Sequence, residues 1–166
     1  MTVILIAVGA NLQSRFGPPR AACDAALAAL EERGIRVVAR SRWWESAPVP
    51  VSEQPWYVNG VAVVETVLDP AQLLAELHAV EDALGRVRTV RNAPRVIDLD
   101  LLAYHNRVIE ADFVVPHPRM DDRAFVVLPL AEVAPCWVHP VTGRTIEELV
   151  AALPAGQEIR PLNHDA

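Results

Sequence analysis

Residues 56–85, WYVNGVAVVETVLDPAQLLAELHAVEDALG, contain both kinds of regular structure and the boundary between them. The valine-rich run Trp56–Val67 is typical of a β-strand. Asp69 is a good N-cap, Pro70 suits the first turn of a helix, and Gln72 completes a capping box. Apolar residues at positions 73, 77, 80 and 84 then form the buried stripe of a helix that ends at Gly85. The segment therefore predicts a strand, a short turn and an amphipathic helix.

The same patterns recur on both sides of this segment. Val3–Val8 predicts a buried strand, and residues 18–34 predict a helix that begins at two prolines and ends at a glycine. Ile35–Trp44 and Arg95–Tyr104 predict two further strands. The resulting order β-α-β-β-α-β predicts an α+β protein of the ferredoxin-like type, in which two helices pack on one face of an antiparallel sheet.

A long loop and additional helices complete the predicted chain. Ser46–Pro55 holds three prolines and predicts a loop of about ten residues, which is longer than most connections. Asp121–Ala134 and a capping box at Thr145–Glu148 predict additional C-terminal helices. No repeat or linker interrupts the chain, so we expect residues 1–166 to form a single domain, with a loosely held tail from about residue 157.

The composition restricts the function. A formal net charge of −6 argues against a general nucleic-acid binder or a protein that binds acidic membranes. All 15 basic residues are arginine, which excludes mechanisms that need a Schiff-base or Walker-type lysine. Cys23 and Cys136 form no zinc or disulfide pattern. The N-terminal apolar run is too short to span a membrane and lacks the basic start of a signal peptide, so we expect a cytoplasmic protein.

The segment Gly85–Asp100, GRVRTVRNAPRVIDLD, is the strongest candidate for chemistry. Four arginines precede Asp98 and Asp100, which in a strand share one face and lie roughly 6.5–7 Å apart. The same face is expected to include Val96, Leu102 and Tyr104. Two carboxylates that face the same way suit a divalent cation, and clustered arginines suit phosphates. The alternative is a solvated polar face of the sheet without a function.

Five other residues have both an ordinary and a functional interpretation. A surface position is the ordinary interpretation of His117, and a solvated carboxylate is that of Glu81. Tyr57 and Phe125, each taken alone, are expected in the core. An amide at Asn59, on the same strand face as Tyr57, is unusual unless it has a hydrogen-bond partner.

Together these residues resemble a known family. The matching pieces are AVGANL at 7–12, QPWYVN at 54–59, GRVR at 85–88, PRVIDLD at 94–100 and VPHPRMDDRAF at 115–125. In this order and spacing they resemble 6-hydroxymethyl-7,8-dihydropterin pyrophosphokinase of folate biosynthesis. The resemblance implies a ferredoxin-like fold with three active-site loops. It also implies an ATP- and magnesium-dependent transfer of pyrophosphate from ATP to the hydroxymethyl group of the pterin, which releases AMP.

The resemblance also implies which residues bind ATP and metal. Asp98 and Asp100 would bind two Mg2+ ions that bridge the phosphates of ATP, and Arg86 and Arg95 would meet those phosphates in catalysis. Further ATP contacts are implied for Glu81, His117 and Arg123. The chain departs from the family pattern at Asn92, in a loop that helps to close the site, and at Asp112 and Val114, near the ATP.

The pterin would be bound by residues from three parts of the chain. By resemblance, Tyr57 and Phe125 would sandwich its ring, and Asn59 would hydrogen-bond its polar edge. Further pterin contacts are implied for Ser46, Ala47 and Val49. A flat heterocycle stacks well between two aromatic faces, which agrees with these assignments.

Two other classes of protein remain as alternatives. Another D-x-D metal enzyme, such as a nucleotide-sugar transferase, would explain the two carboxylates but not the set of Tyr57, Asn59 and Phe125. A non-catalytic ferredoxin-like binding module would need no paired carboxylates on one strand face. Under the leading interpretation the partners are the small-molecule substrates ATP and pterin, and we expect a monomer.

Overall fold

The computed structural model describes residues 2–48, 53, 55–85 and 96–162. A six-stranded sheet forms the centre, with five strands in the order β5-β1-β4-β3-β8 and with β2 paired to β4. The pairings within this sheet are antiparallel. Its strands are β1 (Ile4–Ala10), β2 (Arg36–Arg40), β3 (Trp44–Ser46), β4 (Tyr57–Glu65), β5 (Asp98–Tyr104) and β8 (Ile159–Pro161). The other elements are α1 (Pro19–Glu32), α2 (Pro70–Ala83), the hairpin of β6 (Ile109–Glu110) and β7 (Val114–Val115), a 3-10 turn (Met120–Asp122), α3 (Ala124–Val133) and α4 (Ile146–Ala151).

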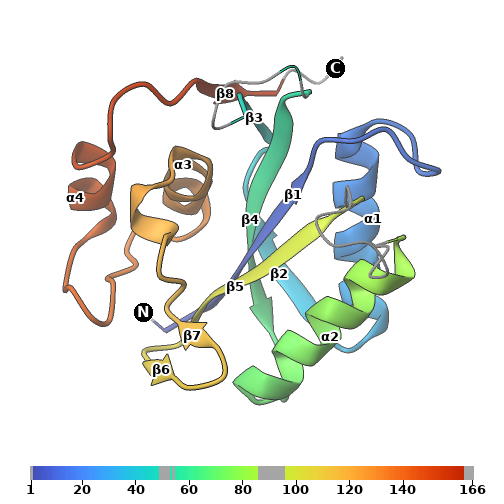
Figure 1. Ribbon diagram of the computed structural model, residues 1–166. Helices are drawn as coiled ribbons and strands as arrows, with labels where there is room; N and C mark the ends of the chain where they lie inside the picture. Colours follow the sequence, from blue (N-terminus) through green and yellow to red (C-terminus); the bar gives the residue numbers. More distant parts are fainter. Residues whose placement is uncertain (1, 49–52, 54, 86–95, 163–166) are drawn as a thin grey trace.

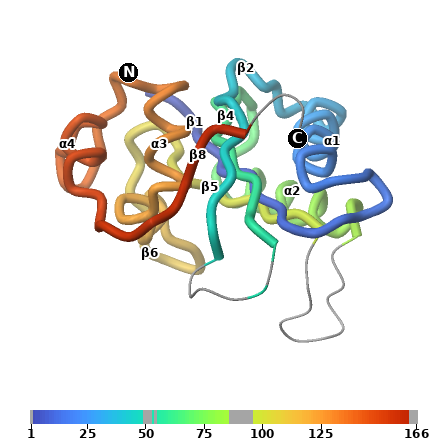
Figure 2. The backbone as a smooth tube through the Cα atoms, turned by 90° about the horizontal axis from the view of Figure 1, so that it is seen from above, coloured from blue at the N-terminus to red at the C-terminus, as the bar shows by residue number. Residues whose placement is uncertain are grey.

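Helices cover both faces of the sheet. Figures 1 and 2 show α1 and α2 on one side of the sheet and α3 and α4 on the other. We call these the α1/α2 face and the α3/α4 face. The sequence predicted the first layer and the additional C-terminal helices, and the second layer shows where those additional helices pack. The described part of the chain is therefore an α+β protein with three layers.

The two helices of the α1/α2 face have the buried apolar stripes and the capping box that the sequence predicts. In α1, the side chains spaced at helical intervals from Cys23 to Leu30 are buried against the sheet. In α2, the predicted capping box is present: Asp69 Oδ1 accepts from Gln72 N at 2.8 Å, and Gln72 Oε1 accepts from Asp69 N at 3.0 Å. The stripe of Leu73, Leu77 and Val80 is fully buried.

Two predicted elements differ in the structure. Ile35–Trp44 is not one strand, because Ser41 interrupts it: its Oγ accepts from Val61 N at 3.0 Å in place of a backbone carbonyl. The segment from about residue 157, which we expected to be loosely held, forms β8 and pairs with β3. The last strand of the sheet thus comes from the end of the described chain.

The alternation of β5 is interrupted by a bulge. Ala103 pairs with Leu5 and Leu101 pairs with Ile6, so Leu102 is an extra residue. As a result, the prediction that Tyr104 shares a face with the aspartates is wrong: Tyr104 packs on the α1/α2 face and its hydroxyl donates to Leu68 O. Val96 also packs against the α1/α2 core, because β5 begins only at Asp98. Leu102 packs on the α3/α4 face, as predicted.

No helix among the described residues is both long enough and apolar enough to cross a membrane.

Candidate active site

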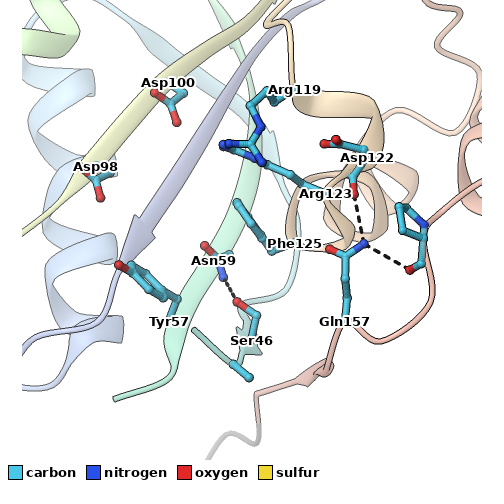
Figure 3. Close-up of a pocket in the computed structure, with 12 residues that line it drawn as sticks. Ser46, Tyr57, Asn59, Asp98, Asp100, Arg119, Asp122, Arg123, Phe125 and Gln157 are labelled. Atoms are coloured by element: carbon cyan, nitrogen blue, oxygen red, sulfur yellow. Dashed lines mark hydrogen bonds between the residues drawn. The ribbon is translucent and has the colours of Figure 1, made fainter. Parts of the chain in front are cut away.

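An open cavity of about 440 Å³ lies on the α3/α4 face. Strands β3, β4 and β5 supply one side of it, and the start of α3 and the segment before β8 supply the other (Figure 3). Its volume falls within the range of small-molecule sites, about 300–1,000 Å³. It is lined by Ser46, Ala47, Tyr57, Asn59, Asp98, Asp100, Arg119, Asp122, Arg123, Phe125, Pro154 and Gln157.

Asp98 and Asp100 are the first and third residues of β5, and both line this cavity. Their positions follow the two-residue period of a strand, as the sequence predicts. Gly9 of β1 lies opposite Asp98, and Ala7 lies opposite Asp100. Because both are small, no bulky β1 side chain covers the carboxylates. Asp100 is exposed and Asp98 is half-buried.

Asn59 is buried at the bottom of the cavity and has the partner that its burial requires. Its Nδ2 donates to Ser46 Oγ at 2.8 Å (Figure 3). A Cβ at Gly9 would lie only 2.9 Å from Asn59 Oδ1, so this glycine makes room for the amide. Tyr57 lies two residues earlier on β4 and lines the same cavity. The Ser46 bond thus fixes one end of the amide, while its oxygen lies over β1.

Two arginines bring positive charge to the side opposite the strands. Arg119 and Arg123 both line the cavity, and the Arg123 guanidinium carbon lies 5.5 Å from the centroid of the Phe125 ring. Burial, followed by the neighbouring Arg119, lowers the pKa of Arg123, while Asp100 opposes this effect. An arginine stays a cation in such surroundings. The cavity therefore places carboxylates and guanidinium groups around one space.

His117 lines a second cavity, of about 260 Å³, which also includes Asp100. The backbone N–H of His117 donates to Leu102 O at 2.9 Å, so the bulge of β5 holds this loop beside the aspartate. Its Nδ1 accepts from Arg119 N at 3.2 Å, which leaves Nε2 as the protonated nitrogen of a neutral ring. Burial lowers the pKa of His117; Asp100 raises it, and Arg123 and Arg119 lower it further.

Glu81 does not have the position that the sequence suggested. It is 3% exposed rather than solvated, and it lines neither of these cavities. Its Oε2 accepts from the backbone N–H of Leu99 at 3.0 Å, on the α1/α2 face of β5. The cause is the packing of α2 directly beneath β5, which directs this side chain toward the strand. Glu81 thus holds the backbone between Asp98 and Asp100.

The remaining predicted site residues divide into two groups. Ser46, Ala47, Tyr57, Asn59, Asp98, Asp100, Arg123 and Phe125 line the larger cavity together, and His117 adjoins it through Asp100. Val49, Arg86 and Arg95 lie outside the described residues.

Several residues that line or support the larger cavity were not predicted from the sequence. Arg119 lies within the quoted motif at 115–125, four residues before Arg123, and this spacing could have indicated it. Gly9 lies within the motif at 7–12, and its close approach to Asn59 is visible only in three dimensions. Gln157 and Pro154 follow the last motif, and no local pattern distinguishes them.

The donors around Asp98 and Asp100 fit a magnesium ion that is shared with a phosphate ligand. Among the described residues, no three His, Cys, Asp or Glu side chains are grouped so that they could hold a metal by themselves. Magnesium commonly takes one or two carboxylates and completes its shell with water and substrate phosphates. Two carboxylates on an open cavity with nearby guanidinium groups meet that requirement.

The fold and this cavity define an α+β protein with an open cavity of small-molecule size, lined by aromatic rings, carboxylates and guanidinium groups. The chain belongs to the family of 7,8-dihydro-6-hydroxymethylpterin-pyrophosphokinase (HPPK), whose sequence pattern matches residues 5–135. The family that the sequence motifs suggested is thereby confirmed.

Relatives from several organisms agree with this assignment. A 2-amino-4-hydroxy-6-hydroxymethyldihydropteridine pyrophosphokinase of Pseudomonas aeruginosa is 42% identical over 153 residues, which cover 91% of this chain and 91% of that protein. The enzyme of the same name from Methylorubrum extorquens is 45% identical over 127 residues, covering 75% of this chain and 79% of its own. The folic acid synthesis protein fol1 of Pneumocystis carinii is 39% identical over 144 residues, covering 86% of this chain but only 19% of that protein.

Solved structures show the same fold. A Plasmodium falciparum HPPK-DHPS crystal structure superposes with a TM-score of 0.70 at 14% sequence identity, over 91% of this chain and 45% of that one. This chain therefore spans less than half of that protein, and about a fifth of the fungal fol1 protein.

Proposed function

We propose that this chain transfers pyrophosphate from ATP to the hydroxymethyl group of 6-hydroxymethyl-7,8-dihydropterin, giving the pterin diphosphate and AMP in folate biosynthesis. The observation that carries the proposal is the composition of the 440 Å³ cavity. Aromatic rings and a fixed amide suit a flat heterocycle, and carboxylates beside guanidinium groups suit a metal-bound phosphate. Family membership and the names of the relatives support the same reaction.

The pterin is assigned to the deeper part of the cavity. Tyr57 and Phe125 supply the two faces between which the ring stacks, and Asn59 supplies the hydrogen bonds to its polar edge. The Asn59–Ser46 bond keeps the amide in one orientation before the ligand arrives, which lowers the entropy lost on binding. Ala47 and Val49 are proposed to add contacts from the same segment.

ATP is assigned to the region where the two cavities meet, because Asp100 lines both. The smaller cavity is largely apolar, with Leu74, Phe113 and Val114 among its walls, and it suits an adenine ring. The neutral His117 offers Nε2–H, and Arg123 offers its guanidinium group, to the phosphates. Arg86 and Arg95 are proposed as further phosphate ligands.

In the reaction, the hydroxymethyl oxygen of the pterin attacks the β-phosphorus of ATP. The bond from that phosphorus to the oxygen bridging to the α-phosphate breaks, AMP leaves, and the hydroxyl proton is lost. No nucleophile from the protein is required, because such transfers depend on alignment and charge neutralisation. The arginines of the cavity supply neutralising charge, and the strand residues fix the pterin oxygen in line.

Two magnesium ions are proposed to bind with ATP at Asp98 and Asp100. When bound, magnesium neutralises phosphate charge and draws electron density from the phosphorus. The two aspartates hold the ions, and the Leu99–Glu81 bond holds the backbone between those aspartates.

The strand order β5-β1-β4, with β2 and β3 beyond β4, supports a ferredoxin-like β-α-β-β-α-β core. In this assignment β2 and β3 together occupy the position of one strand, and β8 and the α3/α4 layer are additions. The return of β8 to β3 supports the interpretation of the chain as one domain.

The proposal is tested by incubating the protein with ATP, magnesium and the pterin, and identifying the nucleotide product. AMP with pterin diphosphate is expected, and no AMP when the pterin is omitted. ADP as the product, or no turnover, would contradict the proposal and favour another metal-dependent transferase or a binding module.

A further inference from the structure

The segment before β8 contributes a side chain to the cavity that connects it to the start of α3. Gln157 is half-buried and lines the cavity. Its Oε1 accepts from Ala124 N at 2.9 Å, and its Nε2 donates to Asp122 O at 3.0 Å and to Pro154 O at 3.4 Å. The two bonds made by Nε2 are drawn in Figure 3. One amide group therefore joins the peptide groups on both sides of Arg123.

The first N–H groups of a helix have no partner within the helix, so α3 needs an external acceptor. Arg123 occupies the N-cap position and its side chain makes no capping hydrogen bond. The acceptor for Ala124 N comes instead from Gln157, which lies 33 residues after Ala124 in the chain. This arrangement leaves the Arg123 side chain available to the cavity while its backbone is held.

Gln157 is itself held by the opposite wall of the cavity. Directly after it, Glu158 O accepts from Ala47 N at 3.0 Å, and Ile159 of β8 pairs with Ser46 of β3. The wall that carries Ser46 and Ala47 is thus connected to the wall that carries Arg123 and Phe125. Backbone contacts join the segment of Gln157 to β3, and the Gln157 side chain joins that segment to the start of α3.

We propose that Gln157 is a positioning residue, which fixes the start of α3 so that Arg123 and Phe125 face the strand side of the cavity at the correct distance. Its effect on turnover rests on the proposed function, whereas its effect on the α3 backbone does not. Positions held to a fraction of an ångström matter here, since a misplacement of about 1 Å in a catalytic site can lower a rate by roughly a hundredfold.

Three variants separate positioning from simple stabilisation. Gln157→Ala removes all these bonds, whereas Gln157→Glu keeps an acceptor for Ala124 N and loses the donor to Asp122 O. Gln72→Ala is the matched control, because Gln72 Oε1 makes a comparable bond to Asp69 N at the exposed start of α2. Hydrogen exchange of the Ala124 amide in the substrate-free protein, thermal melting, and kcat and KM for the pterin are measured for each.

We expect Gln157→Ala to lose protection of the Ala124 amide and to lower kcat/KM for the pterin about tenfold. Gln157→Glu should retain the protection and lose less activity, and Gln72→Ala should change kcat/KM by less than about twofold at a comparable loss of melting temperature. Unchanged protection in Gln157→Ala, or equal kinetic losses in Gln157→Ala and Gln72→Ala, overturns the proposal. A wild-type protein without pyrophosphokinase activity overturns the proposed function instead. The exchange measurement then still tests whether Gln157 holds the backbone at the start of α3.

Discussion

On the α1/α2 face of the sheet, β1, β4 and β5 present buried apolar side chains such as Ile6, Ala62 and Leu99 along their whole length. On the α3/α4 face, the same strands are apolar only at one end, where Leu5 pairs with Val63. At the other end they present the polar side chains of the cavity. Substitutions on the first face should therefore lower stability, whereas those at the polar end of the second should lower binding or turnover with little effect on stability.

The largest effect is expected from Asp100→Ala, since Asp100 lines both cavities. Loss of this carboxylate should reduce kcat by about a thousandfold or more, or about 4 kcal/mol of barrier, and should weaken magnesium-dependent ATP binding. Because Asp100 is exposed, the melting temperature should change little. Steady-state kinetics and thermal melting check both parts.

Glu65→Ala is the matched control for Asp100→Ala. Glu65 is an exposed carboxylate at the far end of β4, in a surface ion pair with Arg36 at 3.6 Å. Its removal should leave turnover unchanged. If Asp100→Ala retained activity within about tenfold of the wild type, the metal role of the aspartates would be wrong.

Two phenylalanines distinguish the two proposed ligand positions. Phe125→Ala removes a ring from the larger cavity and should weaken pterin binding about thirtyfold, with a smaller effect on ATP. Phe113→Ala removes a ring from the smaller cavity and should show the opposite preference. Titration calorimetry with each ligand measures both preferences. Equal losses of both ligands in either variant would contradict the assignment of two separate positions.

Two glycines on adjacent strands test the two faces with the same small change. A Cβ at Gly60 would lie 2.5 Å from the Trp43 ring on the α1/α2 face, so Gly60→Ala should lower the free energy of unfolding by about 1–3 kcal/mol. A Cβ at Gly9 would instead press on Asn59 Oδ1, so Gly9→Ala should weaken pterin binding about fivefold and affect stability less. Urea unfolding and pterin titration on both variants make the comparison. A larger loss of stability in Gly9→Ala and a larger loss of pterin binding in Gly60→Ala would contradict this division between a stabilising face and a ligand-binding face.

The α1/α2 face could be predicted closely from the sequence. Its helices are specified by residues that are close in the sequence: the capping box of Asp69 and Gln72 and the buried stripe that begins at Leu73 are both present in the structure. The positions of Asp98 and Asp100 on one face also followed from the local period of a strand. These features depend on residues that are close in the sequence.

Three other features were predicted less well, because each depends on residues that are distant in the sequence. The bulge at Leu102 reverses the side of Tyr104, and only the register between β1 and β5 reveals it. The burial of Glu81 depends on the strand above α2, and the order of the C-terminal segment depends on pairing with β3. No periodicity within these segments contains that information.

The smallest effect concerns His139, a buried group of the α3/α4 layer. Its Nδ1 accepts from Val141 N at 3.2 Å and from Thr142 N at 3.3 Å, which requires an unprotonated nitrogen. Burial lowers its pKa from 6.5; Asp121 opposes this effect and Arg144 adds to it. Below pH 6.5 the unfolded chain therefore binds a proton that the folded chain does not, so this contribution to stability is present above pH 6.5 and lost as the pH falls.

Substitution by asparagine tests this dependence, because His139→Asn keeps an acceptor near the same two N–H groups but cannot titrate. We expect the free energy of unfolding, measured with urea at pH 7.5 and 5.5, to fall less on acidification in His139→Asn than in the wild type. Part of the dependence should remain, because burial also lowers the pKa of His117. His78→Asn, at an exposed position of α2, should keep the full wild-type dependence. If His139→Asn also kept the full wild-type dependence on pH, the buried imidazole would not be a source of acid sensitivity. The polar groups of the α3/α4 face would then affect ligand binding and turnover but not stability.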